Sequence, residues 1–137
     1  WIELIGILMR RGHVCVILGG PADQAKAEDL ATITGAVSAA GRLQLNSSLA
    51  LISTAQALIG VDTGLTHAAI AFDLPTVAIL GSTWPYERSD SQKTRVLYAG
   101  LQCSPCRRNP TCGGRYECMR SITPASVAMQ LNEALST

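Results

Sequence analysis

The sequence predicts one α/β domain over residues 1–137, built on a Rossmann-like parallel sheet with helices on both faces. Three observations lead to this prediction. Short buried-strand patterns alternate with helical patterns, glycine or proline closes most of the strand patterns, and 137 residues is the usual size of one domain. Hydrophobic residues make up 47% and charged residues 15%, which favours a packed globule over a disordered chain.

The first part of the chain reads as helix, strand and helix. Residues 1–9 have an amphipathic helical pattern with no N-cap before it, so we expect the chain to be a piece of a longer protein. Residues 14–18 are a β-branched and apolar run that Gly19-Gly20-Pro21 closes, as expected for a buried parallel strand. Residues 22–31 then carry alanines and charges at helical spacing.

The rest of the chain continues the alternation. A small-residue linker leads to Ser47-Ser48, which we expect to cap the next helix. We expect strands at 57–61, 76–80 and 95–99, and helices at 49–56, 64–72 and 124–135. Strands and helices that alternate in this way are typical of a parallel sheet joined by right-handed crossovers.

Composition also excludes several classes of protein. A net charge of +1 and a pI near 7.8 give no case for nucleic-acid binding, which needs a concentrated basic face. The longest apolar runs fall well short of a membrane span, and residues 1–4 lack the basic region of a signal peptide. We therefore expect neither membrane insertion nor export.

The most informative motif is Val61-Asp62-Thr63-Gly64-Leu65-Thr66-His67, which leaves a predicted strand and opens a predicted helix. Unpaired amides at a helix N-terminus bind phosphate, and Gly64 would let the phosphate approach. Thr63 can add a hydroxyl donor, and His67 lies one turn further on the same face. Asp62 would repel a phosphate, so we expect it to cap the helix or to accept a hydrogen bond that orients the loop. An ordinary cap and turn explains the same pattern, so the motif alone leaves both readings open.

Two stretches of the sequence resemble a known family. Residues 62–69, Asp-Thr-Gly-Leu-Thr-His-Ala-Ala, followed by residues 74–83, resemble the donor-site signature of family 9 glycosyltransferases, the lipopolysaccharide heptosyltransferases. The cysteine-containing tail over residues 103–124 resembles the C-terminal stretch of the heptosyltransferase II branch. The resemblance extends from Gly12 to Leu135, and it is interrupted by Trp84-Pro85-Tyr86-Glu87-Arg88, which departs from the family pattern.

The resemblance implies the C-terminal, nucleotide-sugar-binding domain of a GT-B enzyme. Such an enzyme transfers heptose from ADP-heptose to the lipopolysaccharide inner core with inversion. By this resemblance Thr63, Gly64 and Leu65 hold the donor diphosphate. Asp62 and His67 contact the sugar or its phosphate.

The resemblance also implies the surroundings of that site. The loop ending at Leu43 lies at the adenine, and Gly20 and Asp23 approach the ribose. The acceptor and the general base belong to an N-terminal domain that this chain lacks, so the chain has no catalytic residue of its own and is inactive alone. No metal or other cofactor is needed. The enzyme is cytoplasmic, and contact with the inner face of the inner membrane is left open.

The tail contains four cysteines in the spacing C-x2-C-x5-C-x5-C, at Cys103, Cys106, Cys112 and Cys118. The first pair has the spacing of a zinc knuckle and the second does not, so reduced, partly buried thiols are the simpler interpretation. Disulfides are disfavoured in a cytosolic protein. Cys15 lies in a predicted strand and is expected to be a core residue.

Four arginines, Arg107, Arg108, Arg115 and Arg120, lie in the same tail. They would form a rim that meets a phosphorylated acceptor or a membrane surface, or simply a solvated cluster. Two alternative functions remain at this point: a GT-B transferase for another nucleotide sugar, and a non-catalytic module stabilised by zinc. A dinucleotide-binding dehydrogenase is disfavoured because no G-x-G-x-x-G follows the first predicted strand.

Overall fold

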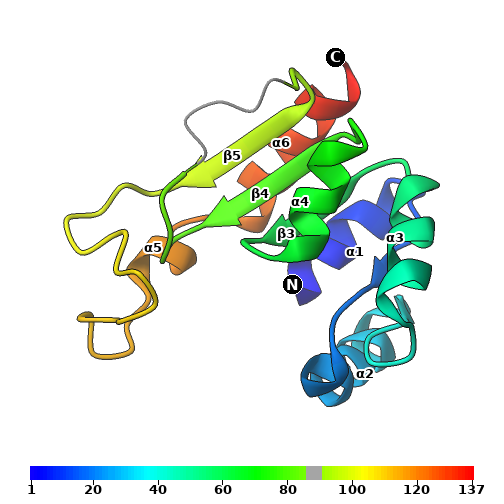
Figure 1. The fold of residues 1–137 in the computed structure, drawn as a ribbon, viewed down its shortest axis with the longest axis horizontal. Helices are drawn as coiled ribbons and strands as arrows, with labels where there is room; N and C mark the ends of the chain where they lie inside the picture. Colours follow the sequence, from blue (N-terminus) through cyan, green and yellow to red (C-terminus); the bar gives the residue numbers. More distant parts are fainter. Residues whose placement is uncertain (86–90) are drawn as a thin grey trace. The chain divides into compact units, whose positions relative to one another are not determined.

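A computed structural model describes residues 1–85 and 91–137 and divides them between two compact units, Trp1–Leu51 and Ile52–Thr137 (Figure 1). Each unit is described by itself. Tyr86, Glu87 and Arg88, in the segment that departs from the family pattern, lie outside the described residues. The single domain expected over residues 1–137 stays a prediction.

The first unit contains two short strands separated by a helix. A further helix precedes the first strand, and another follows the second. Its elements are α1 (Ile2–Arg10), β1 (Val16–Ile17), the 3-10 turn η1 (Pro21–Asp23), α2 (Gln24–Thr34), β2 (Val37–Ser38) and α3 (Leu45–Ser53), the last of which reaches the boundary between the units. β1 and β2 pair in parallel, with Val16 opposite Val37. Gly35 ends α2 in the left-handed conformation, at φ 80°, and its N–H donates to the carbonyl of Ala31.

Three expectations for this unit were wrong. β2 was taken as linker, because two residues between small neighbours give no periodic signal. β1 is shorter than 14–18, and Val14 before it is 83% exposed. α3 begins at Leu45, so Ser48 is a buried residue inside the helix and not its cap; its N–H donates to the carbonyl of Gln44.

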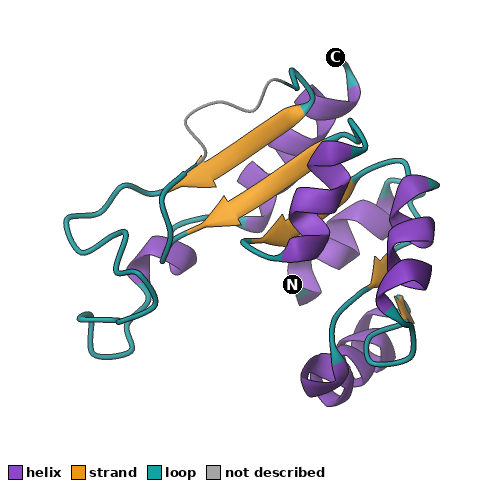
Figure 2. Ribbon diagram, in the orientation of Figure 1, coloured by secondary structure: helices purple, strands orange, loops and turns teal. Residues whose placement is uncertain are grey.

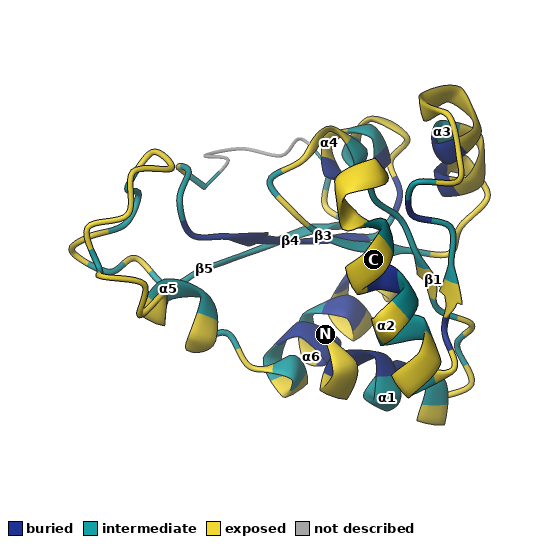
Figure 3. Cartoon of the chain, turned by 90° about the horizontal axis from the view of Figure 1, so that it is seen from below, coloured by how far each residue is buried: buried dark blue, intermediate teal, exposed yellow. Residues whose placement is uncertain are grey.

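The second unit contains a three-stranded parallel sheet. Its elements are β3 (Leu58–Val61), α4 (Gly64–Ala71), β4 (Thr76–Leu80), β5 (Thr94–Tyr98), α5 (Glu117–Arg120) and α6 (Pro124–Leu135). The strand order is β3-β4-β5, with neighbouring strands parallel (Figure 2). Every residue of the central strand β4 is buried. α4 lies on one face of this sheet and α6 on the other (Figure 3). The predicted α/β class, with parallel strands and helices on both faces, is confirmed.

The core of this unit lies between β4 and its flanking helices. Val77 and Leu80 of β4 are almost fully buried, and α6 adds four buried residues, Val127, Ala128, Leu131 and Ala134. Thr123 caps α6 by accepting a hydrogen bond from the Ser126 N–H at 3.1 Å. The single helical turn α5 was not predicted. Within residues 1–85 and 91–137, every helix is too short or too polar to cross a bilayer.

Candidate functional site

The turn between β3 and α4 presents free backbone donors. Thr63 is the N-cap residue of α4, in an extended conformation, and its side chain makes no capping hydrogen bond. The amides of Thr66 and His67 both donate to the Thr63 carbonyl, at 3.1 and 3.2 Å. The amides of Gly64 and Leu65 meet no acceptor in the described part of the chain. Two N–H groups at the positive end of the helix are therefore available to an anion.

Thr66 fixes this turn from inside the protein. Its side chain is buried, and its hydroxyl donates to the carbonyl oxygen of Val61 at 2.6 Å. The hydroxyl occupies the space where a side chain on Gly60 would begin, so β3 needs glycine at that position. The sequence motif contains Thr66, but the structural role of this residue was not predicted.

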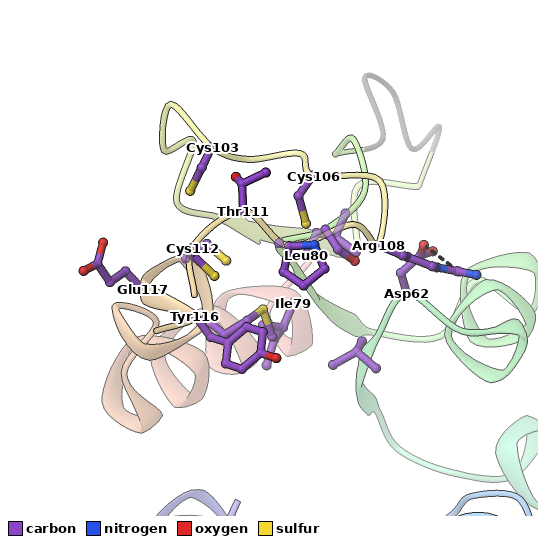
Figure 4. A pocket seen from close by; sticks show the side chains of 16 residues that line it. Asp62, Ile79, Leu80, Cys103, Cys106, Arg108, Thr111, Cys112, Tyr116 and Glu117 are labelled. Carbon is purple, nitrogen blue, oxygen red and sulfur yellow. Dashed lines mark ion pairs between the residues drawn. The ribbon is translucent and has the colours of Figure 1, made fainter. Parts of the chain in front are cut away.

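Asp62 lies between two cationic or ionisable side chains. Its Oδ1 is 3.2 Å from Nε2 of His67. Its Oδ2 is 3.8 Å from Nη2 of Arg108, an ion pair that Figure 4 marks with a dashed line. Asp62 does not occupy the N-cap position of α4, and it accepts a hydrogen bond from the helix instead, the second of the two roles expected for it. Arg108 comes from the cysteine-rich tail and joins the motif across 46 positions of the sequence, a contact that the sequence alone did not reveal.

A cavity of about 360 Å³ opens beside Asp62, at the carboxyl ends of β3 and β4 (Figure 4). One wall is the end of the sheet and the loop that follows it, including Ser82. The other wall is the tail, which contributes Arg108, Tyr116 and the four cysteines Cys103, Cys106, Cys112 and Cys118. In parallel α/β sheets ligands bind beyond the carboxyl ends of the strands, so the cavity lies where this class of fold places a ligand.

Hydrogen bonds connect the tail to the residues that follow β4. The Arg107 N–H donates to the Ser82 carbonyl at 2.8 Å, and the Ser104 hydroxyl donates to the Gly81 carbonyl. A Cβ on Gly81 would lie 2.7 Å from Sδ of Met119, so a larger residue there would force the Met119 side chain to move. Gly81 was recognised in the sequence as closing a strand, but not as the point where the tail docks.

The cysteines do not form a metal centre in this geometry. Among residues 1–85 and 91–137, no three His, Cys, Asp or Glu side chains are grouped so that they could hold a metal ion. All five cysteines are free thiols. Hydrogen bonds from the backbone, that of Tyr116 first, lower the pKa of the Cys112 thiol, whereas burial raises the pKa of Cys15. The described residues thus give no support to the module stabilised by zinc.

Comparison with known families decides the assignment. The model of glycosyltransferase family 9 (heptosyltransferase) matches residues 1–116. The chain belongs to glycosyltransferase family 9. It is 32% identical to lipopolysaccharide heptosyltransferase 2 of Salmonella typhimurium over 99% of the chain, and 30% identical to that of Escherichia coli over 98% of the chain. The chain spans 41% of the length of each of these relatives.

Solved structures of heptosyltransferases share the fold of this family 9 chain. E. coli ADP-heptose lps heptosyltransferase II superposes with a TM-score of 0.81 at 27% identity, covering 98% of this chain and 40% of that one. E. coli heptosyltransferase WaaC with ADP-2-deoxy-2-fluoro heptose gives a TM-score of 0.71 at 25% identity, covering 97% of this chain and 36% of that one. The fold is thus that of GT-B heptosyltransferases, as the sequence predicted.

The expected donor-site residues of this family 9 chain fall in both units. Asp62, Thr63, Gly64, Leu65 and His67 lie together at the β3–α4 turn. Gly20, Asp23 and Leu43 belong to the first unit. There the Asp23 carboxylate accepts from the Gly20 N–H at 3.0 Å, and Leu43 is 37% exposed. The donor-binding roles of all eight residues stay predictions.

Proposed function

We propose that the chain is the donor-binding domain of an inverting heptosyltransferase that transfers heptose from ADP-heptose to the lipopolysaccharide inner core. The observation that carries the proposal is the β3–α4 turn, where the amides of Gly64 and Leu65 are open to a ligand. Membership of family 9 and the likeness to a heptosyltransferase solved with ADP-2-deoxy-2-fluoro heptose support it.

The β3–α4 turn holds the diphosphate. The amides of Gly64 and Leu65 donate to phosphate oxygens, and the exposed Thr63 hydroxyl adds a third donor. Among the described residues, nothing beyond the neighbouring backbone lies within 4 Å of the point where a Cβ on Gly64 would be, so a phosphate has room beside them. Asp62 and His67, already hydrogen-bonded to each other, contact the sugar or its phosphate.

The nucleoside is held by residues of the first unit. Leu43 packs against the adenine with its exposed apolar side chain. Gly20 and Asp23 approach the ribose, where the Asp23 carboxylate, held by the Gly20 amide, accepts a hydrogen bond from a ribose hydroxyl.

The transfer step breaks the bond between the anomeric carbon of heptose and the phosphate oxygen, and an acceptor hydroxyl oxygen forms a new bond to that carbon from the opposite side. The electron pair leaves with ADP, and the acceptor proton passes to a general base in an N-terminal domain. Negative charge grows on the diphosphate, so fixed amides at the helix terminus stabilise the transition state by roughly 3 kcal/mol where the bound donor excludes water, as single oxyanion donors do elsewhere.

The whole enzyme works in the cytoplasm on an acceptor bound by its N-terminal domain. The tail arginines supply a local cationic rim for the phosphorylated acceptor or an anionic membrane surface. Two of them are partly neutralised, Arg108 by Asp62 and Arg115 by Glu117 at 3.5 Å. Binding of the chain to vesicles rich in anionic lipid at physiological salt tests this role of the arginines. Absence of binding would refute the proposed contact with a membrane surface.

Titration calorimetry with ADP, UDP and GDP tests the donor assignment. We expect ADP to bind most tightly and the chain alone to transfer no heptose. Tighter binding of UDP or GDP would instead indicate a family member that uses another nucleotide sugar. Failure of all three nucleotides to bind would remove the donor-site proposal.

A further inference from the structure

Arg108 is the tail arginine that reaches the proposed donor site. Its side chain lines the cavity beside Asp62, and its Nη2 lies 3.8 Å from Asp62 Oδ2 (Figure 4). Asp62 directly precedes the N-cap residue of α4, whose first amides are open to an anion. Among the described residues, the cavity wall includes Arg108 but none of Arg107, Arg115 and Arg120. The fold therefore brings one guanidinium of the tail, and not the charge of the whole tail, to the end of β3.

A tight turn sets the position of Arg108. The Asn109 N–H closes the turn by donating to the Cys106 carbonyl at 2.9 Å, and the Arg107 N–H connects it to the Ser82 carbonyl at 2.8 Å. Both central residues are in the left-handed conformation, with φ 51° at Arg107 and 66° at Arg108. Glycine and asparagine adopt this conformation more easily than arginine, so the geometry of the turn does not by itself account for arginine here. The base of the Arg108 side chain is thus held beside the residues that follow β4.

The ion pair with Asp62 leaves the guanidinium of Arg108 available to a ligand. The Arg108 side chain is 75% exposed, and 3.8 Å is longer than a charge-assisted hydrogen bond of about 2.7–2.9 Å. A pair exposed this far contributes little to stability. The planar fork of N–H donors matches the oxygens of a phosphate. The guanidinium can therefore exchange the carboxylate for a phosphate at low cost.

The balance of charge around the cavity favours this exchange. The N-terminus of α4 contributes roughly half a positive charge, whereas the Asp62 carboxylate contributes a full negative one. His67, on the other side of Asp62, adds positive charge only when protonated. Glu117, the other acidic residue of the cavity wall, is paired with Arg115 at 3.5 Å. Arg108 is the permanently charged cation that reverses the sign of the charge near Asp62, so that an anion is attracted and not repelled.

We propose that Arg108 is a further donor-binding residue, which turns from Asp62 to the diphosphate of the nucleotide sugar when the donor binds. The inference rests on the proposed function, because it assigns Arg108 to the ligand proposed there. Negative charge grows on the departing ADP during transfer, and a guanidinium in contact with the diphosphate stabilises that charge together with the amides of Gly64 and Leu65.

Calorimetry of ADP binding to the 137-residue chain tests the assignment. R108Q removes the charge and keeps a polar side chain, and we expect the dissociation constant to rise about tenfold, the lower end of the loss for one hydrogen bond to a charged group. R107Q removes the same charge from the neighbouring exposed position of the same turn, outside the cavity wall, and should bind ADP as the parent does. Circular dichroism checks that both variants are folded. Parental affinity in R108Q, or equal losses in R108Q and R107Q, would overturn the proposal.

A double variant separates contact with the diphosphate from screening of Asp62. R108Q also leaves the Asp62 carboxylate without this cation, which by itself weakens the binding of an anion. D62N removes that carboxylate. We expect D62N/R108Q to bind ADP about tenfold more weakly than D62N, because Arg108 contacts the ligand directly. Equal affinities of D62N and D62N/R108Q would show that Arg108 acts only through Asp62, and would overturn the proposed contact.

Inorganic pyrophosphate distinguishes failure of this inference from failure of the proposed function. It carries two phosphates and no nucleoside, so its binding needs no residue of the first unit. We expect the parent chain to bind pyrophosphate more weakly than ADP, with a further loss in R108Q. If the parent and R108Q bind ADP equally well, the role of Arg108 is refuted and the proposed function stands. If the parent binds pyrophosphate through Arg108 but binds no nucleotide, the proposed function fails and the anion-binding role of Arg108 remains. If the parent binds neither ligand, both proposals fail.

Discussion

The hydroxyl of Thr66 donates a 2.6 Å hydrogen bond to the carbonyl oxygen of Val61, and this bond ties the first turn of α4 to the end of β3. The carbonyl lies at the last residue of the strand, where the chain leaves the sheet ladder. Thr66 is 1% exposed, so its hydroxyl makes this bond within the protein and not to bulk water. The bond therefore fixes the first turn of α4, and with it the position of the open amides of Gly64 and Leu65. A site for a defined anion requires donors in fixed positions.

Two matched threonine substitutions test this support. T66V keeps the shape of the side chain but removes the donor to the part-buried Val61 carbonyl, so we expect the free energy of unfolding to fall by about 1 kcal/mol. T63V, three residues earlier, removes an exposed hydroxyl that makes no capping bond and only a long hydrogen bond, 3.4 Å, with Thr66 Oγ1, so it should change stability by about 0.5 kcal/mol or less. Urea unfolding followed by circular dichroism measures both. Equal losses in the two variants would contradict the assigned role of Thr66.

A glycine pair at the same turn separates packing from binding. A Cβ on Gly60 would collide with the Thr66 hydroxyl and lie 3.2 Å from Cδ2 of Leu58. A Cβ on Gly64 would meet nothing within 4 Å in the part of the chain that the structure describes. We expect G60A to lower the free energy of unfolding by about 1–3 kcal/mol through overpacking. G64A should leave stability nearly unchanged. Thermal unfolding of both variants measures these effects. A G60A variant as stable as the parent would show that β3 shifts to accommodate the added methyl group at little cost.

The donor proposal predicts that T63V binds ADP more weakly although it folds normally. A hydrogen bond to a charged group contributes about 1.5–3 kcal/mol, which corresponds to a loss of affinity of roughly tenfold to a hundredfold. T32V is the matched control, because Thr32 is exposed on α2 and its hydroxyl donates only to the Glu28 carbonyl of its own helix. Calorimetry should give parental affinity for T32V. Parental affinity in T63V as well would remove Thr63 from the diphosphate site.

Local patterns predicted the parts of the fold that are determined locally. β4 and α6 have the bounds expected from a continuous apolar run and from a proline after a capping threonine. β2 was missed because its two residues form a strand only by pairing with β1. The start of α3 was placed four residues late because two serines resembled a cap, although the backbone hydrogen bonds continue through them.

In the candidate site too, local features were predicted from the sequence and contacts between distant segments were not. Thr63 and Gly64 were identified from the sequence because a strand followed by a polar turn and a helix is a local pattern. The ion pair of Arg108 with Asp62 and the docking of the tail at Gly81 join segments distant in sequence. No spacing rule predicts such contacts, and they decide which side chains line the cavity.

The contact of Asp73 with Lys93 predicts a pH dependence of stability. Hydrogen bonds from Lys93 Nζ at 2.6 Å and Ser91 Oγ at 2.7 Å lower the pKa of Asp73. A carboxyl whose pKa is lower in the folded state stabilises the protein above its unfolded pKa, and this contribution is lost as the pH falls through the folded pKa. D73N keeps a residue that tolerates the φ of 54° at this position but removes the charge.

We expect D73N to be less stable than the parent at neutral pH, with the difference shrinking as the pH is lowered through the acidic range where Asp73 becomes protonated in the folded protein. D29N removes the same charge from an exposed position on α2 and is the control for net charge. Urea unfolding of the three proteins at a series of pH values measures the effect. Because the partners of Asp73 are hydrogen-bonded to its charged form, a D73N deficit that stays constant with pH would mean that the contact with Lys93 does not form in solution.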